Sequence, residues 1–225
     1  MTAPAITVHR EPSPLGVVVR VGWFALLVVA GLAAGIEGER IIREAAASPD
    51  ALAVANAGAP YAVVLAVLAM VRRSPAWAAA DALGFFAAYV GGYYLAVAVH
   101  HGGAAVDRHY ALVWLLVALV ACPIGAAAIT WARARPGVLR AVVFAVPASA
   151  ALAEALTGRM WGMGDLLAPV VLTADLLVAA GYVLVLPRGL RTRIVAAVLV
   201  VPGTIGFVAL TQHLTATGAF WRYVY

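Results

Sequence analysis

Seven apolar stretches of about 20 residues alternate with short polar segments along the chain. Each stretch is long enough to cross a bilayer as a helix. We predict helices because a segment in hydrocarbon must satisfy its own backbone hydrogen bonds, and the two-residue alternation of a strand is absent. The pattern therefore predicts an all-α, polytopic transmembrane bundle of seven helices. The predicted spans are 15–36, 51–71, 76–99, 110–132, 137–158, 166–186 and 194–213.

The second stretch is interrupted by Asn56, Gly58 and Pro60, and a re-entrant segment there would leave six crossing helices. No connection is long enough to separate domains, so residues 1–225 are expected to form one integral-membrane domain with an N-terminal cytoplasmic tail, 1–14. The longest connection, 37–50, is predicted to be a short amphipathic segment on the outer surface.

The distribution of arginine predicts the orientation in the membrane. All 15 basic residues are arginines, and cytoplasmic loops carry the excess of positive charge. Ten arginines fall on one side of the predicted bundle: Arg10, Arg20, Arg72, Arg73, Arg133, Arg135, Arg140, Arg188, Arg191 and Arg193. Five fall on the other: Arg40, Arg43, Arg108, Arg159 and Arg222. The N-terminus is therefore expected in the cytoplasm and, after seven spans, the C-terminus outside.

The composition supports a bilayer environment. With 65% apolar and 11% charged residues, a soluble fold of this length would lack the polar side chains to cover its surface. The net charge of +5 is spread over short loops, so no basic patch for nucleic acid is predicted. Cys122 is the sole cysteine and lies in an apolar run, which predicts a small buried residue without a disulfide. We predict no cofactor and no metal site.

The stretch 76–99 carries a small residue at every fourth position. These residues are Ala80, Gly84, Ala88, Gly92 and Ala96. Positions four apart lie on one face of a helix, and small residues there allow a second helix to approach closely. We interpret this face as a helix-packing surface.

A more polar stripe follows on the same stretch and contains Asp81, Tyr89 and Tyr93. Two interpretations stay open: the tyrosines fill a gap between helices with their hydroxyls bonded to carbonyls, or they line a cavity that binds a ligand. Asp81 lies near the cytoplasmic end of its span. We expect it to form a structural ion pair with Arg20, which lies at a similar depth.

Glu154 lies one turn from the outer end of its span, within reach of Arg159 or of Arg40 and Arg43. We expect a structural ion pair here as well. The polar side chains that we assign to one candidate cavity are Asp175, Tyr182, Asp81, Tyr89, Tyr93, Asn56 and Glu154.

Asp175 differs from the other acids because it is the tenth residue of the 21-residue span 166–186, about 15 Å from either end. No arginine of the predicted topology lies at that depth, so desolvation favours the protonated acid. We expect either a neutral acid that donates to a carbonyl or a tyrosine, or a group whose task is to bind a proton or a metal cation. Tyr182 lies two turns away on the same face.

The string Gly162-Met163-Gly164-Asp165 has the Gly-x-Gly-Asp form of membrane aspartyl proteases, including prepilin peptidases. Such enzymes need two aspartates that share a proton. The predicted topology places Asp165 in an outer loop, and no second aspartate motif is present. A membrane aspartyl peptidase therefore stays a remote alternative.

Several short motifs fall between residues 56 and 186: Asn56-Ala57-Gly58-Ala59-Pro60-Tyr61, Arg72-Arg73, Gly91-Gly92-Tyr93-Tyr94, Trp114, Cys122-Pro123-Ile124-Gly125 and Ala153-Glu154-Ala155-Leu156. On these residues the chain resembles a family of small uncharacterised bacterial multi-pass membrane proteins known as a domain of unknown function. The resemblance implies a helical bundle and carries over no catalytic residue.

Three classes of function follow, ranked in this order. The first is a non-catalytic membrane protein that acts as an accessory subunit through its small-residue faces. The second is a permease for a small molecule or an ion, or the substrate-binding membrane component of a transporter, that uses Asp175. The third is an enzyme that uses Asp165. The expected partners are the lipid bilayer and either a membrane protein or a second copy, and the expected location is the bacterial inner membrane.

Overall fold

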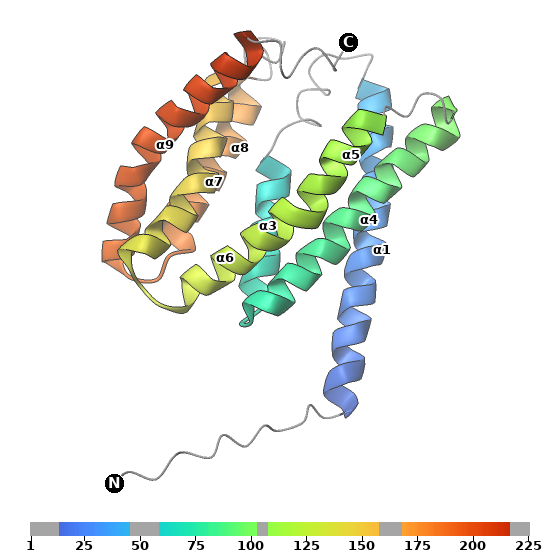
Figure 1. The fold of residues 1–225 in the computed structure, drawn as a ribbon, viewed down its shortest axis with the longest axis horizontal. Coiled ribbons are helices and arrows are strands. Elements are labelled where there is room, and N and C mark those ends of the chain that lie inside the picture. The colour runs from blue at the N-terminus through green and yellow to red at the C-terminus, as the bar shows by residue number, and fades with distance from the viewer. Residues whose placement is uncertain (1–13, 46–58, 103–107, 158–167, 217–225) are drawn as a thin grey trace.

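The computed structural model describes residues 14–45, 59–102, 108–157 and 168–216 (Figure 1). Apart from short connections these residues are helical, and none of them forms a strand, so the predicted all-helical fold is confirmed. The elements, in chain order, are α1 (Pro14–Ala45), α3 (Ala59–Val71), α4 (Pro75–His101), α5 (Arg108–Leu116), η2 (Val117–Ala121), α6 (Cys122–Ala134), α7 (Val138–Thr157), α8 (Ala168–Ala180), η4 (Gly181–Val185) and α9 (Leu190–Ala216).

Two of these elements are single π turns within longer helices. The amide of Cys122 donates to the carbonyl of Val117, and the amide of Leu186 donates to that of Gly181, each five residues back. Pro123 lies two residues after the end of the first turn and has no amide proton, which explains the local change in hydrogen bonding. The rods α5–η2–α6 and α8–η4 are therefore continuous, and the described residues form seven helices, as predicted.

Five of the helices are long and apolar enough to cross a membrane: α1, α4, the rod α5–η2–α6, α7 and α9. The helices α4, α7 and α9 begin and end within four residues of their predicted bounds. The other two, α3 and α8–η4, are shorter within the described residues. Residues 51–58, which would show whether the second stretch spans fully, lie outside the described residues.

The predicted connection 37–50 was wrong in its first part, because α1 continues to Ala45. Arg40 pairs with Glu37 and Glu44, which lie three and four residues away on the same helix. Such pairs stabilise a helix beyond the apolar stretch. Glu39 is buried against the end of α4 and ties this extension to the bundle.

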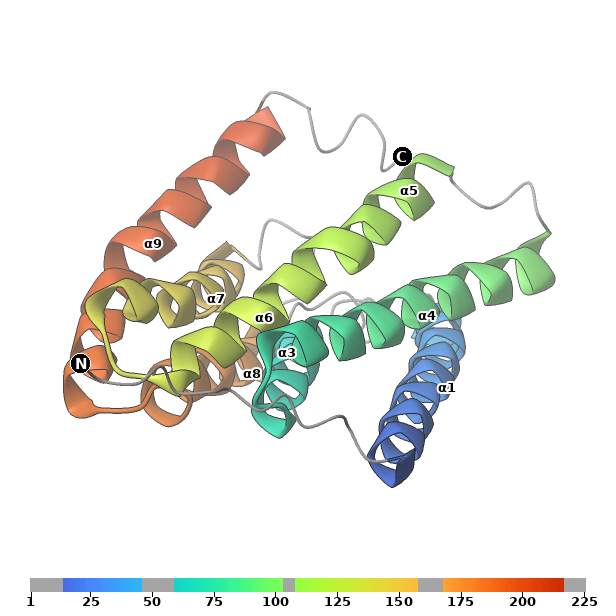
Figure 2. The same cartoon turned by 60° about the horizontal axis from the view of Figure 1, so that its bottom comes forward.

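The helices run between two ends of the molecule (Figure 1). The connections 72–74, 135–137 and 186–189 lie at the lower end of that view and carry arginines. We call this the arginine end. Helix α4 packs against α1 and α6, while α7 packs against α8 and α9. Helix α3 lies between the two groups and contacts α6 on one side and α8 on the other (Figure 2).

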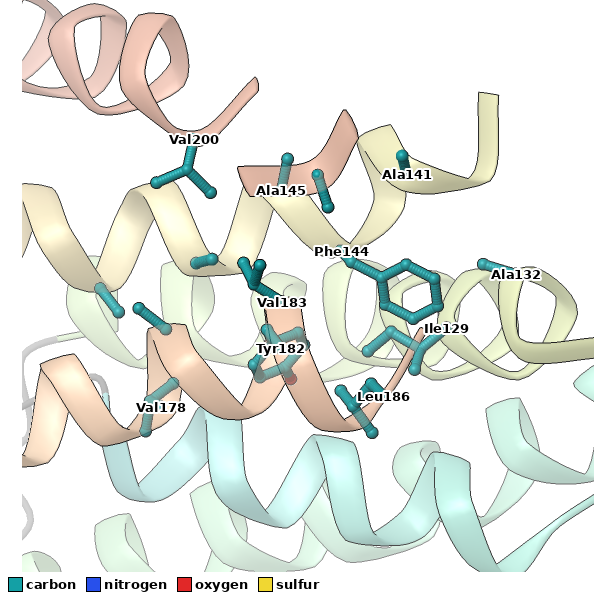
Figure 3. Close-up of a cluster of buried hydrophobic side chains, with 14 of the residues drawn as sticks. Ile129, Ala132, Ala141, Phe144, Ala145, Val178, Tyr182, Val183, Leu186 and Val200 are labelled. Carbon is teal, nitrogen blue, oxygen red and sulfur yellow. The ribbon is translucent and has the colours of Figure 1, made fainter. Parts of the chain in front are cut away.

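The larger core surrounds α7, which contributes the buried residues Ala141, Phe144 and Ala145 (Figure 3). Val200 of α9 and Tyr182 of η4 approach it from opposite sides. The alanines let neighbouring helices come close to α7, so van der Waals contact between helices can stabilise the bundle without a hydrophobic driving force.

Candidate functional site

Asp175 lies in the interior of α8, seven residues after Ala168 and ten before Val185. Its exposed fraction is 0%. Neither of its carboxyl oxygens has a hydrogen-bond partner among the described residues. An enclosed and unpartnered carboxyl group is unfavourable in either protonation state, because water is lost and nothing replaces it.

Glu154 of α7 is an acidic neighbour of Asp175. It lies close enough for its charge to interact with the carboxyl group of Asp175. Arg40 and Arg43, two of the partners expected for Glu154, instead pair with glutamates of their own helix, and Arg159 lies outside the described residues. The structure therefore places two carboxyl groups on facing helices, α7 and α8.

Tyr182 does not bond to Asp175. Its hydroxyl donates to the carbonyl oxygen of Ala62 in α3 at 2.9 Å, and Figure 3 shows the ring lying between the α7 core and α3. The seven-residue spacing places Asp175 and Tyr182 on one side of a regular helix, but the π turn begins at Gly181 and changes the register there. Tyr182 thus ties η4 to α3.

Asp81 forms an ion pair, but the predicted partner was wrong. The Nε atom of Arg72 lies 2.5 Å from Oδ2 of Asp81, and Trp23 donates to the same oxygen at 3.1 Å. Arg20 instead lies over the ring of Trp77. Asp81 is only 1% exposed, so Arg72 and Trp23 satisfy a buried carboxylate near the arginine end.

The tyrosine stripe of α4 is divided between two surroundings. The hydroxyl of Tyr89 lies 2.9 Å from that of Tyr61, in contact with α3. Tyr93 lines a cavity of about 280 Å³ at the other end of the bundle, together with Glu39 and His101. Asn56, also assigned to the predicted cavity, lies outside the described residues. The structure therefore does not bring Asp175, Asp81 and these tyrosines into one cavity.

Glu39 is the centre of a cluster that the sequence patterns did not indicate. Its side chain is 3% exposed, and Oε1 lies 3.2 Å from Nε2 of His101 and 3.4 Å from Nε of Arg43. The Oε2 atom lies 3.4 Å from Nδ1 of His100. The adjacent histidines at the end of a predicted span were the signal available in the sequence. They belong to α4, whereas Glu39 belongs to α1.

The small-residue face of α4 contacts α1 at its glycines. An added Cβ at Gly84 would lie 2.6 Å from the ring of Phe24, and one at Gly92 would overlap the carbonyl of Leu32. Ala96 is buried, while Ala80 and Ala88 are partly exposed. On the opposing surface, Gly31 and Gly35 of α1 approach carbonyls of α4 equally closely. The close approach thus depends on glycines of both helices.

Within the described ranges, no group of three or more histidine, cysteine, aspartate or glutamate side chains could hold a metal ion. Asp165, on which the peptidase alternative depends, lies outside these ranges. The chemistry that the described site offers is proton binding by Asp175 and Glu154, two carboxyl groups in an apolar bundle.

Residues 21–216 match a family described as "Family of unknown function (DUF6518)". The chain belongs to this family. The matched range is wider than residues 56–186, where the short motifs lie, and includes most of α1 and all of α9. No curated protein and no solved structure matches the chain. The described residues of this DUF6518 chain are all-helical, and five of their helices are long and apolar enough to cross a membrane, so the chain is a membrane protein.

Proposed function

We propose that this DUF6518 chain is a non-catalytic permease that moves protons, or a solute coupled to protons, with Asp175 as the proton-binding group. The observation that carries the proposal is the enclosure of Asp175, whose two oxygens lack a hydrogen-bond partner among the described residues. In hydrocarbon, a charged or unpartnered acid is retained against a stability cost, which is typical of a functional group.

The proton is favoured over a metal cation for a geometric reason. A cation such as Ca²⁺ requires six or more oxygen ligands, and Mg²⁺ an octahedral set. Asp175 offers one carboxyl group, and Glu154 of the facing helix a second. A proton needs no further ligand, and it can reach an enclosed group through a brief opening that would not admit a larger solute.

Glu154 supplies a route toward Asp175 from the opposite end to the arginines. It lies three residues before the end of α7, whereas Asp175 lies seven residues into α8. Two carboxyl groups at different depths on facing helices form the kind of step by which pumps and transporters pass protons inward. The π turn η4 supports the same interpretation, since such turns are frequent at functional sites.

Proteoliposomes that contain the purified protein and a pH-sensitive dye are expected to take up protons under an imposed potential. Asp175→Asn should reduce uptake to the level of empty liposomes, because the amide cannot accept and release a proton. Glu154→Gln should slow it. In carboxyl infrared spectra, a band of protonated acid at pH 7 should disappear in Asp175→Asn.

Asp165→Asn is the matched control, and it is expected to transport like the wild type. Equal uptake by wild type and Asp175→Asn would refute the proton-binding role. Cleavage of a membrane-protein substrate that Asp165→Asn abolishes would instead favour the peptidase.

An accessory subunit is the second candidate. What supports it is that Asp175 lines neither the cavity beside Glu39 nor the apolar groove between α3 and α8. An acid that does not line a cavity suits a protein in which the acid is structural and the function is to bind a partner. Absence of proton uptake in wild type and variants, with co-purification of a membrane protein in stoichiometric amount, would favour this class.

We also propose that the arginine end faces the cytoplasm of a bacterial inner membrane. The arginine-rich connections 72–74, 135–137 and 186–189 gather at that end, which agrees with the excess of positive charge in cytoplasmic loops. Reporters fused after Arg73, Arg135 and Arg193 are expected to read cytoplasmic, and those after Ala105 and Tyr225 external. A cytoplasmic C-terminus would mean that the second predicted span does not cross.

A further inference from the structure

An apolar groove of about 470 Å³ runs between α3 and the rod α8–η4. Val67 and Met70 of α3 line one wall, and Val185 and Leu186 the other. The first three of these side chains are about half exposed or more, so the groove is open along the outer face of the bundle. In a bilayer, such an open apolar surface contacts lipid chains.

The length of the groove matches one leaflet. Its lining on α3 extends from Ala59 to Met70, twelve residues whose ends are about 16 Å apart along the helix. The hydrocarbon core of a bilayer is about 30 Å thick, so one leaflet provides about 15 Å. The groove therefore has the length of one acyl chain that begins at the arginine end.

Arg133 and Arg188 lie where the groove reaches the arginine end. Nη1 of Arg133 donates to the carbonyl of Ala69, the residue before Met70, at 3.3 Å. Arg188 follows the lining residue Leu186 by two positions and lies close enough for its charge to repel that of Arg133. Neither arginine lines the groove itself, but each contacts or follows a residue at its arginine end.

Among the described residues, these two arginines have no anionic partner. None of the ion pairs among the described residues includes either of them, and Asp81, the acid at this end, is paired with Arg72. The Nε atom of Arg133 is buried without a hydrogen-bond partner in the part of the chain that the structure describes. Two like charges beside an unsatisfied donor are stabilised by an anion, and the planar guanidinium suits phosphate.

We propose that this site binds an anionic phospholipid, with its phosphate between Arg133 and Arg188 and one acyl chain in the groove along α3 and η4. Charge complementarity favours a lipid over an apolar helix of a partner, because a helix would fill the groove but leave the arginines without an anion. The arginine end also corresponds to the leaflet that carries negative surface potential if it faces the cytoplasm.

Native mass spectrometry of the full-length protein tests the proposal after delipidation and addition of phosphatidylglycerol or phosphatidylcholine with identical chains. The wild type is expected to retain one phosphatidylglycerol in preference to phosphatidylcholine. The double variant Arg133→Gln, Arg188→Gln should weaken retention of phosphatidylglycerol by about tenfold or more, since hydrogen bonds to charged groups are lost. Arg191→Gln is the matched control and should bind like the wild type.

The acyl chain is tested separately with Gly181→Leu. A Cβ at Gly181 meets no heavy atom within 4 Å, so the side chain of a leucine there starts into the groove without a clash at its Cβ. This variant should retain the fold and bind neither phosphatidylglycerol nor phosphatidylcholine. Gly206→Leu, whose Cβ also projects into open space, should bind the two lipids like the wild type. Soluble glycerol phosphate at equal concentration should not displace the lipid, which separates a lipid site from a simple phosphate site.

Equal retention of the two lipids by the wild type would overturn the proposal. Unchanged retention in Gly181→Leu would also overturn it, and does not depend on whether the double variant folds. Dimerisation that Gly181→Leu abolishes, without lipid preference, would assign the groove to a second copy instead. These outcomes are independent of proton uptake through Asp175.

Discussion

Replacing Gly92 by leucine is expected to separate α1 from α4 and to abolish recovery of folded protein in detergent. A Cβ at Gly92 would overlap the backbone carbonyl of Leu32, which cannot rotate away as a flexible side chain could. Overpacking a well-packed contact typically costs about 1 to 3 kcal/mol, and a clash with backbone lies at the upper end or beyond. Folding yield, measured by size-exclusion chromatography and helical circular dichroism, checks the prediction.

Gly91 provides the matched control for this substitution. It is the adjacent residue, it is exposed, and a Cβ there meets no heavy atom within 4 Å. Gly91→Leu should therefore fold like the wild type. Leu95→Ala removes a side chain that is 55% exposed and should also have little effect. If Gly92→Leu behaves as the wild type while Leu95→Ala does not, the small-residue face of α4 contacts lipid.

Asp81→Ala is expected to lower the free energy of unfolding by about 3 kcal/mol, because it leaves the guanidinium of Arg72 without its carboxylate. Asp175→Ala should instead raise the free energy of unfolding. Removal of an acid whose oxygens lack partners among the described residues relieves a desolvation penalty of about 1 to 3 kcal/mol, less the small cavity that remains. Thermal or denaturant unfolding in detergent measures both values.

One double variant and one further measurement distinguish the roles of the two acids. Asp81→Ala combined with Arg72→Met should recover much of the lost stability, because the second substitution removes the uncompensated charge. Asp175→Ala should in addition abolish proton uptake while the fold is retained. A loss of several kcal/mol in Asp175→Ala would show that Asp175 has a partner that stabilises the bundle.

The helices were predictable because the apolar composition of each stretch indicates that it lies in the bilayer. An apolar stretch must close its backbone hydrogen bonds internally, so the stretches 76–99 and 137–158 led almost directly to α4 and α7. The gathering of arginines at one end was also predictable, because loops alternate between the two sides. The extension of α1 to Ala45 was missed, since its stabilising pairs lie beyond the apolar stretch.

The partners of the polar residues were less predictable. Depth along a span suggested Arg20 for Asp81, but depth does not tell which neighbour faces it. Arg72 precedes the helix that carries Asp81, and the turn between α3 and α4 folds it back onto the carboxylate. The spacing of Asp175 and Tyr182 assumed a regular α-helix, and the π turn at Gly181 is not visible in the residue pattern.

The sequence by itself determined the solvent, the helices, the charge asymmetry and the presence of an acid at mid-span, because these depend on local composition and on helix length. Only the tertiary structure decided that Asp175 is enclosed without a partner among the described residues, that Glu39 meets the histidines of α4, and that a groove beside α3 points toward the end where Arg133 and Arg188 lie. Each of these depends on which faces of distant helices meet. Packing between helices sets those faces, and local periodicity carries no information about the partner.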